Sequence, residues 1–315
     1  MKIYRFLILL VATSGLVFFT GCGNQVQQKE TDTPTSGKIK IAVDDAYRLL
    51  IDTEIYTFTS IYRNTAVDTI CRNENEVFSL FMKDSVPLMV VNRQLTKDET
   101  DYLTSRQSIA RTTRIAIDGI AFIVNKENPD SNLLFNDIRD IFKGRMKQWK
   151  QINPKSGLGG IKVIFDHVKS GNPRYFKDKF GLDSLPGICF AVANNAEVIS
   201  FVEKNKEAIG LISVNWISDR EDTISQRFLK NVRVAGISPE GSTDHAGNFY
   251  QPFQYYIAQG FYPFTREVYF INRQSYSGLA FGFTSFVAGN QGQLIVLRSG
   301  LVPAVMPVRI VEIKR

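Results

Sequence analysis

From residue 38 onward, short apolar runs alternate with stretches in which apolar residues recur every three or four positions. The short runs predict β-strands, and the periodic stretches predict amphipathic helices. Strands that alternate with helices in this way favour parallel sheets and the α/β class. The predicted strands are 38–43, 67–70, 86–91, 115–124, 161–165, 208–214, 232–237 and 267–271. The predicted helices are 44–62, 74–82, one that begins at Thr96, 136–149 with a break at Gly144, 172–180, 194–204, 277–288 and 292–299, and an extended tail covers 301–313.

Three of these boundaries carry signals of their own. Thr96 and Glu99 have the spacing of a capping box. Asn172 followed by Pro173 predicts a helix with the asparagine as N-cap and the proline at the first helical position. The Asp118–Gly119 pair interrupts an apolar run, and it predicts a bend or a crossing between two parts of the fold in place of one straight strand.

The start of the chain has the pattern of a secretory signal peptide. A short basic start precedes an apolar run that is too short for a comfortable membrane span, and small residues come directly before Cys22. We expect a signal peptide over 1–21. The segment 22–37 is polar and cannot bury enough apolar surface to offset its chain entropy, so we expect a flexible linker there.

Thr20–Gly21–Cys22 resembles a bacterial lipobox, although Phe19 stands where that motif prefers leucine. The resemblance implies that Cys22 is lipidated and becomes the mature N-terminus. The product would be an exported domain that acyl chains anchor to the outside of a membrane of the bacterial cell envelope. The alternative is an ordinary signal peptide with an incidental cysteine.

Composition narrows the function classes without selecting one. Residues 38–315 are enough for two lobes with cores, and 44% hydrophobic with 22% charged residues is ordinary for a globular chain. The formal net charge of +7 is mild, which fits attraction of anions and gives little support for nucleic-acid binding. His167 and His245 have no partner at ligand spacing, so we expect no metal site. We expect Cys71 and Cys189 to be buried free thiols, with a disulfide as the alternative.

Several phrases, in order along the chain, resemble the phosphate-binding proteins of ABC importers. They cover nearly all of 38–303, and no single phrase is decisive. The phrases are Ile115–Ala121 with Val124–Pro129, Asp140–Gly144 with Trp149–Lys150, Ala208–Ile212, Tyr262–Tyr269, Gly292–Gln293 with Gly300–Pro303, and Asn92–Thr96 with Glu99.

That resemblance implies a type II periplasmic binding protein, an α/β fold with two lobes, two crossing strands and an interlobe cleft. It implies lobe 1 over 38–114 plus 236–315 and lobe 2 over 115–235. The crossings would then fall near 114–118 and 232–236. It also implies a monomer whose partners are a small anion, phosphate first, and an ABC permease.

The loop before the predicted helix at 172 is the strongest candidate for an anion site. A strand-to-helix loop presents free backbone N–H groups and the positive end of a helix. Ser170 adds a hydroxyl donor, Gly171 permits close approach and Lys169 adds charge. Ser170 and Gly171 match the family's pattern, whereas Asn172 stands where threonine is usual. The alternative is that this segment only caps a helix.

The facing lobe departs further from the family's pattern. The family has a glycine-serine-threonine type of loop where this chain has Asp44–Asp45–Ala46, and two carboxylates oppose a phosphate unless they are N-caps that point away. Arg72 is a candidate anion contact, or a solvated surface arginine. The ligand-binding candidates are Asp45, Ala46, Arg72, Asn92, Arg93, Lys169, Ser170, Gly171 and Asn172.

Other clusters favour ordinary roles. Five cations around Trp149 suggest a solvated helix face more than a nucleic-acid surface. The aromatic run over 250–264 suggests core and hinge packing, with a partner surface as the alternative. No dinucleotide fingerprint, nucleotide P-loop or nucleophile elbow appears in the sequence, so we expect neither a cofactor nor an enzyme, and a hydrolase is only a third hypothesis.

The leading hypothesis is therefore an extracytoplasmic lipoprotein that captures phosphate or a related oxyanion for an ABC importer by hinge closure. The alternative keeps the fold but makes the chain a sensor, a scavenger or a surface interaction protein with a different ligand. The mixed chemistry of the predicted site keeps this alternative open.

Overall fold

The structure is a computed structural model that describes residues 32–218, 230, 232–244 and 246–305. The predicted signal peptide, Cys22 and most of the predicted linker lie outside the described residues, as do His245 and the last part of the predicted tail. Within the described ranges, no helix is long and apolar enough to cross a membrane.

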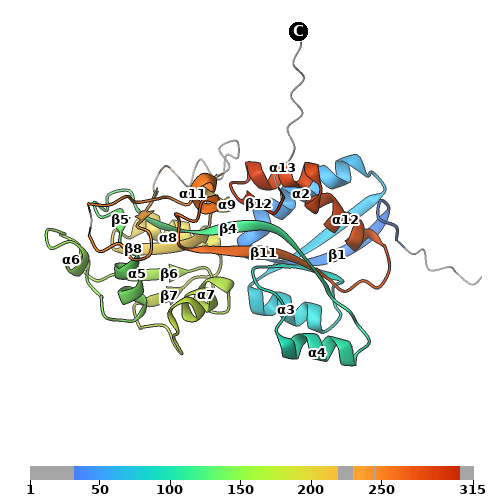
Figure 1. Cartoon of the computed structure of the whole chain (residues 1–315), viewed down its shortest axis with the longest axis horizontal. Coiled ribbons are helices and arrows are strands. Elements are labelled where there is room, and N and C mark those ends of the chain that lie inside the picture. The colour runs from blue at the N-terminus through green and yellow to red at the C-terminus, as the bar shows by residue number, and fades with distance from the viewer. Residues whose placement is uncertain (1–31, 219–229, 231, 245, 306–315) are drawn as a thin grey trace, which may run out of the picture. The chain divides into compact units, whose positions relative to one another are not determined.

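Strands and helices alternate along the described chain, as the sequence pattern predicts (Figure 1). The strands are β1 (Gly37–Asp44), β2 (Thr65–Arg72), β3 (Leu88–Val91), β4 (Arg111–Asn125), β5 (Asn132–Leu133), β6 (Lys162–Phe165), β7 (Cys189–Ala191), β8 (Ala208–Ser213), β9 (Val232–Val234), β10 (Gly236–Ile237), β11 (Thr265–Asn272) and β12 (Val302–Pro303). The helices are the 3-10 helix η1 (Asp45–Tyr47) and α2 (Arg48–Ile61), α3 (Glu74–Met82), α4 (Lys97–Ser105), α5 (Phe135–Phe142), α6 (Trp149–Ile152), α7 (Gly171–Phe180), α8 (Asn195–Lys204), α9 (Asn215–Ser218), α11 (Gln254–Ala258), α12 (Leu279–Ala288) and α13 (Asn290–Arg298).

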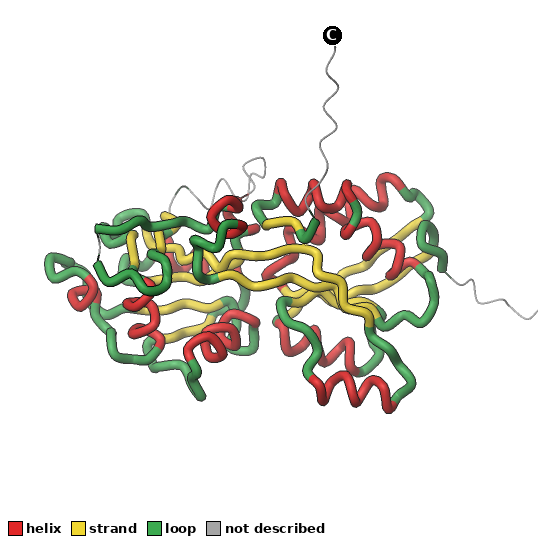
Figure 2. Tube along the Cα trace, viewed as in Figure 1, coloured by secondary structure: helices red, strands yellow, loops and turns green. Residues whose placement is uncertain are grey.

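One mixed sheet joins most of the strands in the order β2-β1-β3-β11-β4-β8-β6-β7. β1 is parallel to β2 and β3, and β6 is parallel to β7 and β8. Between these parallel groups, β4 and β11 run antiparallel. Figure 2 shows long strands that connect the two groups. We call the part built on β1, β2 and β3 the β1 lobe, and the part built on β6, β7 and β8 the β6 lobe. The predicted α/β class with two lobes is confirmed.

β4 carries the chain from one lobe to the other. Its residues 111–119 pair with β11, and its residues 120–124 pair with β8. The exchange of partners falls beside the Asp118–Gly119 pair. A Cβ on Gly119 would lie 2.8 Å from Ile257 Cδ1 and 2.9 Å from Pro252 Cβ, so the close packing at the exchange requires glycine.

The second crossing, by which the chain returns from the β6 lobe to the β1 lobe, is the one predicted near 232–236. Ile237, Ile257 and Phe264 pack in the same core as α5 and α7 of the β6 lobe. The Phe264 carbonyl accepts from Ile120 N at 2.9 Å, next to the β4 exchange. The chain then enters β11, which pairs with β3 of the β1 lobe. The lobe boundaries stay a prediction, and these contacts lead us to propose a return at β11 in place of 232–236.

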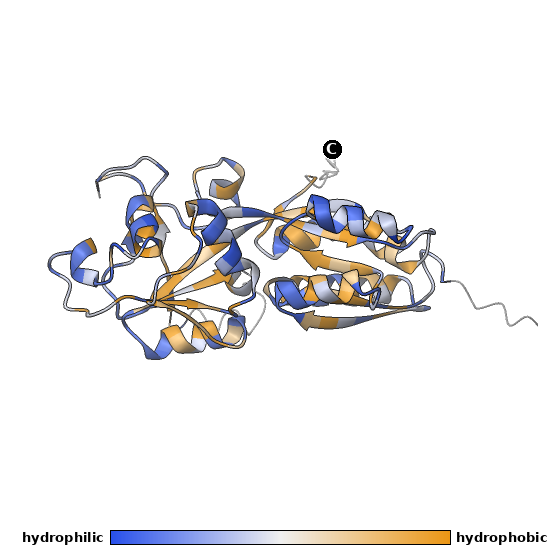
Figure 3. Ribbon diagram, turned by 90° about the horizontal axis from the view of Figure 1, so that it is seen from below, coloured by the Kyte–Doolittle hydropathy of each residue, from blue (hydrophilic) through white to orange (hydrophobic). Residues whose placement is uncertain are grey.

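Helices cover both faces of the sheet in each lobe. In the β1 lobe, α2, α12 and α13 pack on one face of β1, while α3 and α4 pack on the other. In the β6 lobe, α5 and α7 share a phenylalanine-rich core with β6 and the second half of β4. Figure 3 shows apolar strands between helices whose polar residues lie on the outer side. Amphipathic helices in this position are what the 3.6-residue periodicity predicts.

The helix boundaries divide into confirmed and corrected predictions. The helix 74–82 is confirmed, and so is the capping box, because Thr96 Oγ1 accepts from Glu99 N while the Glu99 side chain accepts from Thr96 N. The start of α7 is wrong by two residues: Ser170 is the N-cap and Gly171 the first helical residue. The predicted break at Gly144 is confirmed, because α5 ends at Phe142 and Gly144 takes the left-handed conformation with φ of 70°; the part predicted after the break, up to 149, is not helical before Trp149.

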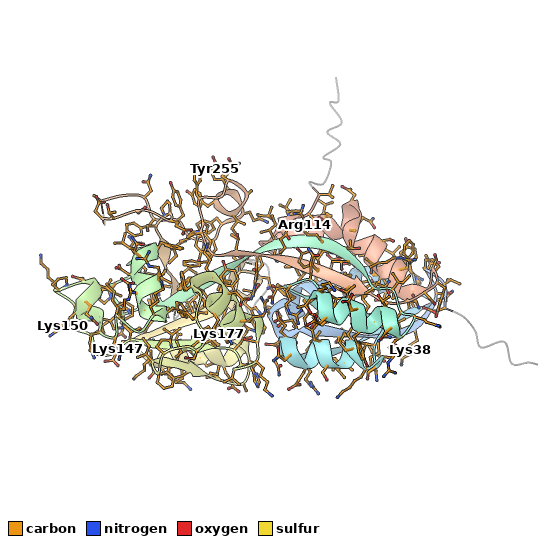
Figure 4. All side chains as sticks on the ribbon, turned by 60° about the horizontal axis from the view of Figure 1, so that its bottom comes forward. Lys38, Arg114, Lys147, Lys150, Lys177 and Tyr255 are labelled. Atoms are coloured by element: carbon orange, nitrogen blue, oxygen red, sulfur yellow. The ribbon has the colours of Figure 1, made fainter. Side chains whose placement is uncertain are left out.

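The basic cluster of the β6 lobe lies far from the α7 start. Lys147 and Lys150, labelled in Figure 4, lie at the outer edge beside α6. All the predicted cluster members are exposed, and Trp149 is buried beneath them: the cations are Lys143, Arg145, Lys147, Lys150 and Lys155. The cluster therefore has the geometry of a solvated surface.

The aromatic run divides between core and surface. Tyr262 and Phe264 are buried in the β6-lobe core. Phe253 and Tyr255 are more than half exposed, and Tyr255 projects from α11 in Figure 4. The prediction of core packing is therefore confirmed for only part of the run.

The two cysteines of the described chain, Cys71 and Cys189, are free and partly buried. Burial raises the pKa of the Cys189 thiol to about 12. The structure agrees with free thiols and excludes the alternative of a disulfide between these two residues.

Candidate functional site

The loop that follows β6 sets the first side of the candidate site. Ser170 caps α7 through its backbone, but its hydroxyl donates to Asp166 Oδ1 at 2.7 Å in place of capping a helical N–H. Asn172 Nδ2 donates to the same carboxylate oxygen at 3.0 Å. Ser170, Gly171 and Asn172 are all buried. The first turn of α7, whose N–H groups have no intrahelical acceptors, is thus enclosed against the β1 lobe.

The facing side comes from α3 and from the residue after β3. Glu74, 1% exposed, accepts two bonds from Arg174 of α7: Nε to Oε1 at 2.6 Å and Nη2 to Oε2 at 3.0 Å. Arg174 Nη2 also donates to Asn92 Oδ1 at 2.6 Å. Asn92 Nδ2 in turn donates to Asp44 Oδ2 at 3.0 Å. One guanidinium therefore ties the two lobes together across the site.

Gly171 makes this approach of the lobes sterically feasible. A Cβ at this position would lie 2.3 Å from Asn92 Nδ2 and 2.8 Å from Glu74 Oε2, well inside contact distance. A direct backbone bond lies beside it, from Asn75 N to Lys169 O at 3.3 Å. The close approach that Gly171 permits in the structure is that of the β1 lobe, and its predicted approach to an anion stays a prediction.

A second buried guanidinium reaches the site from the crossing strands. Arg266 of β11 lies opposite Asp118 of β4 in the sheet register, and its Nε donates to Asp118 Oδ2 at 3.0 Å. Its Nη1 donates to Asn172 Oδ1 at 2.8 Å. Its Nη2 is buried and has no hydrogen-bond partner among the described residues. Arg266 therefore connects the crossing strands to the start of α7 and keeps one donor unused.

Burial and like charges shift the titration of the carboxyl groups around the site. Burial holds the pKa of Asp44 well above its usual range, and the nearby Glu74 and Asp166 raise it further while Arg266 lowers it. Burial also raises the pKa of Asp166, against the hydrogen bond from Ser170 and the charge of Arg266. The physical consequence is a preference of these groups for the neutral, protonated form.

η1 of the β1 lobe is held by the β6 lobe at a second place. Asp45 Oδ2 accepts from Asn195 N at 3.2 Å and from Asn195 Nδ2 at 2.9 Å. The Ala46 carbonyl accepts from Asn215 Nδ2 at 2.7 Å. Asp44 is the N-cap of η1 and accepts from Ala46 N at 3.1 Å. Asp44 thus serves as an N-cap and Asp45 as an interlobe acceptor. The alternative of N-caps that point away holds for the capping by Asp44 but not for its direction, because Asp44 also accepts from Asn92 at the site.

Two of the predicted cations lie at the periphery. Arg72 is exposed, pairs with Glu76 at 3.5 Å and donates to the neighbouring Cys71 carbonyl. Lys169 has an exposed side chain, and only its backbone takes part in the interlobe contact. An open pocket of about 900 Å³ beside α3 and α8 has both Asp45 and Arg72 in its wall. The structure therefore places Arg72 in the wall of this pocket and outside the hydrogen-bonded network at the α7 start.

Arg93 lies between the periphery and the centre. Its guanidinium stacks 3.5 Å from the centroid of the Phe78 ring and forms two bonds with Glu99, at 2.7 and 2.8 Å. Its Nε is 3.8 Å from Glu74 Oε1. The structure thus brings Arg93, Asn92 and the α7 start into one network through Glu74.

The sequence analysis assigned no binding role to four central residues. Glu74, Arg174, Asp118 and Arg266 form the ion pairs of the site. Asp118 and Arg266 lie inside phrases that resemble the phosphate-binding family, and this position could have marked them as functional residues. Glu74 and Arg174 had no such signal, because an acid at a helix start and a basic residue in its first turns are ordinary surface features.

Comparison with known proteins agrees with the two-lobe geometry. The profile of the PBP superfamily domain matches residues 28–291 of this chain. The chain belongs to the PBP superfamily. Phosphate-binding protein PstS of Staphylococcus saprophyticus is 24% identical over 211 residues, which cover 67% of this chain and 62% of that relative. PstS of Staphylococcus haemolyticus is 24% identical over 173 residues, which cover 55% of this chain and 54% of the relative.

Solved structures of this superfamily share the fold. A candidate phosphate ABC transporter substrate-binding protein with bound phosphate from Clostridium perfringens superposes with a TM-score of 0.70 at 19% identity, covering 85% of this chain and 100% of the other. An ABC-type phosphate transport receptor from Vibrio cholerae has a TM-score of 0.61 at 20% identity, with 84% and 99% coverage. At these identities the likeness establishes the fold, and the ligand has to be argued from the site.

Proposed function

We propose that this chain is the solute-binding component of an ABC importer and that it captures phosphate or a related oxyanion between its lobes. The observation that carries the proposal is the convergence of two guanidinium groups, Arg174 and Arg266, on the first turn of α7. Arginine forks and helix starts are the groups that bind multi-oxygen anions in proteins. The relatives described as phosphate-binding proteins point to the same ligand class.

The proposed mechanism is hinge closure without any chemical step. β4 and β11 continue from one lobe into the other, so bending of these two strands changes the separation of the lobes. An anion that contacts both α7 and the β1 lobe favours the closed arrangement by its higher affinity for that arrangement. The family consists of solute-binding transport proteins, and catalysis is not needed for this role.

We propose in addition that the protein is exported and works as a monomer with an ABC permease as partner. Cys22 would be its lipid attachment site, with 22–37 as the leash to the folded part. The support is the sequence pattern of the first residues, which lie outside the described part of the structure. A Cys22→Ser variant that no longer fractionates with membranes would support the anchor, and unchanged membrane retention would overturn it.

One observation favours the alternative of a scaffold that has changed its ligand. The hydroxyl of Ser170 and the amide of Asn172 already donate to Asp166, and the carboxylate of Glu74 lies on the opposite side, paired with Arg174. Like charges in a buried site oppose a dianion. A sensor or scavenger for a less charged ligand would meet less opposition there.

Calorimetric titration of the purified chain separates the two functions. We expect saturable binding of phosphate and weaker or no binding of sulfate and acetate at the same ionic strength. Ser170→Ala should weaken phosphate binding by about tenfold, because the proposal has the Ser170 hydroxyl turn from Asp166 to the bound anion, and a charge-assisted hydrogen bond contributes roughly 1.5–3 kcal/mol. Absence of binding for every anion would favour the changed scaffold, and unchanged affinity in Ser170→Ala would move the site away from α7.

A further inference from the structure

Glu74 lies where the start of α7 meets the β1 lobe. Its carboxylate is buried, and it faces a fork of two Arg174 donors, Nε at 2.6 Å and Nη2 at 3.0 Å. Its Oε2 lies 2.8 Å from the position that a Cβ of Gly171 would take, which places the carboxylate beside the first helical residue. A bound oxyanion would have the same two surroundings, a guanidinium fork and the positive end of a helix.

An unused donor that is linked to the first turn of α7 points independently to a ligand. Arg266 is 6% exposed, its Nη1 donates to Asn172 Oδ1, and its buried Nη2 has no hydrogen-bond partner within the described residues. A buried guanidinium N–H without an acceptor costs free energy, so it is a place where an added oxygen atom would be stabilised. Asn172 is the second residue of α7 and follows Gly171, beside which the Glu74 carboxylate lies, so the donor and Glu74 belong to the same helical turn.

The chain also offers a second place for Glu74 if its carboxylate leaves Arg174. Arg93 Nε is already 3.8 Å from Glu74 Oε1, and its guanidinium is stacked on Phe78. Arg174 has little capacity for two anions at once, because its remaining Nη1 donates to Asp178 at 3.2 Å. An incoming anion on the Arg174 fork therefore has to replace Glu74.

We propose that Glu74 is an internal competitor that occupies the oxyanion position on Arg174 and lowers the affinity of the site for external anions. The inference rests on the proposed function and deepens it, since it names the residue that sets how tightly, and for how many negative charges, the site binds. An anion gains the Arg174 fork only by displacing Glu74 towards Arg93. A weakly charged ligand gains less from that exchange than phosphate does, so Glu74 also shapes selectivity.

Glu74→Gln tests the proposal, because it removes the negative charge and keeps the shape of the side chain. We expect phosphate affinity measured by calorimetry to increase at least about tenfold, the effect of one charge-assisted hydrogen bond no longer contested. Glu74→Asp, with a shorter reach towards Arg174, should shift affinity in the same direction by less. Glu76→Gln on the same helix removes an exposed charge that pairs with Arg72, and it should leave affinity within about twofold.

The outcomes separate this inference from the proposed function. Tighter binding in Glu74→Gln supports the inference, and so does binding that only this variant shows. If the unsubstituted chain binds phosphate and both Glu74 variants bind equally or more weakly while thermal unfolding shows that they are folded, the internal competitor is overturned and the proposed function stands. If neither the chain nor any variant binds an anion, both are overturned.

Discussion

Two buried ion pairs meet at the start of α7, and they are held together in different ways. Asp118 and Arg266 are directly opposite each other on neighbouring antiparallel strands, so the sheet register fixes their separation. Glu74 and Arg174 come from two helices of different lobes, and only the packing of the lobes brings them together. The Arg266 side chain is 3% exposed, whereas that of Arg174 is 29% exposed.

This difference assigns the two pairs to different tasks. The crossing pair cannot be hydrated without breaking the pairing of β4 and β11, so it stabilises the connection between the lobes. The interlobe pair can be hydrated when the lobes separate, so it can exchange partners with a ligand. The same chemistry, a guanidinium on a carboxylate, thus serves as a structural link in one place and as a removable contact in the other.

Asp118→Ala should have the largest effect and tests the structural side of the comparison. The substitution leaves the Arg266 charge buried without its carboxylate, so we expect the free energy of unfolding to fall by about 3–5 kcal/mol in chemical denaturation. Asp101→Ala, which removes an exposed partner of Lys97, should change it by no more than about 0.5 kcal/mol. A small loss in Asp118→Ala would contradict the distinction.

Glu54 of α2 extends the comparison to a buried carboxyl group that has no cationic partner among the described residues. Neither of its oxygen atoms has a partner among the described residues, and burial raises its pKa to about 9 from an ordinary value of 4.5. The folded chain therefore keeps a proton that the unfolded chain releases. Its contribution to stability is fully present below pH 4.5 and is lost as the pH rises towards 9.

Glu54→Gln should therefore flatten the pH dependence of unfolding. Each pH unit above 4.5 lowers the free energy of unfolding of the unsubstituted chain by about 1.36 kcal/mol. The variant avoids this loss, which amounts to roughly 3 kcal/mol at pH 7. Denaturation at pH 4 and pH 8 provides the measurement, with exposed Glu76→Gln as the control. A wild-type profile that is flat over this range would show that Glu54 is hydrated or paired.

Arg174→Ala should have the smallest effect on stability and a clear effect on binding. Because water can reach Glu74 when the lobes part, we expect a loss of only about 1 kcal/mol in the free energy of unfolding. Phosphate affinity should fall by about tenfold or more, since the anion loses its guanidinium fork. Arg145→Ala removes an exposed arginine of the same lobe and should change neither quantity. A stability loss as large as that of Asp118→Ala would erase the comparison.

Local order was largely predictable from the sequence, because short-range rules determine it. The apolar runs predicted the main strands, the spacing of Thr96 and Glu99 predicted a capping box, and Asp118–Gly119 marked the place where β4 changes partners. The start of α7 was misplaced because Asn172 and Pro173 satisfy the local rule for a helix start, while the structure uses Asn172 to bond Asp166 and Arg266. Tertiary contacts there override the local preference.

The chemistry of the site was less predictable, because it depends on contacts between residues that are far apart in the sequence. Ser170, Gly171, Asn172 and Asn92 were candidates because their residue types suit an anion, and the structure brings them together. Glu74 and Arg174 are one hundred positions apart in sequence, and nothing within either segment indicates the other.

The sequence by itself determined the alternation of strands and helices, the α/β class and the loop that leads into α7, because each depends on residues close together in the chain. The tertiary structure alone decided which carboxylate faces which guanidinium. That choice depends on the register of β4 with β11 and on the approach of α3 to Gly171, distances that only the folded chain defines. Burial then gives the Asp118–Arg266 pair its strength, since a charge that water cannot reach must find its partner within the protein.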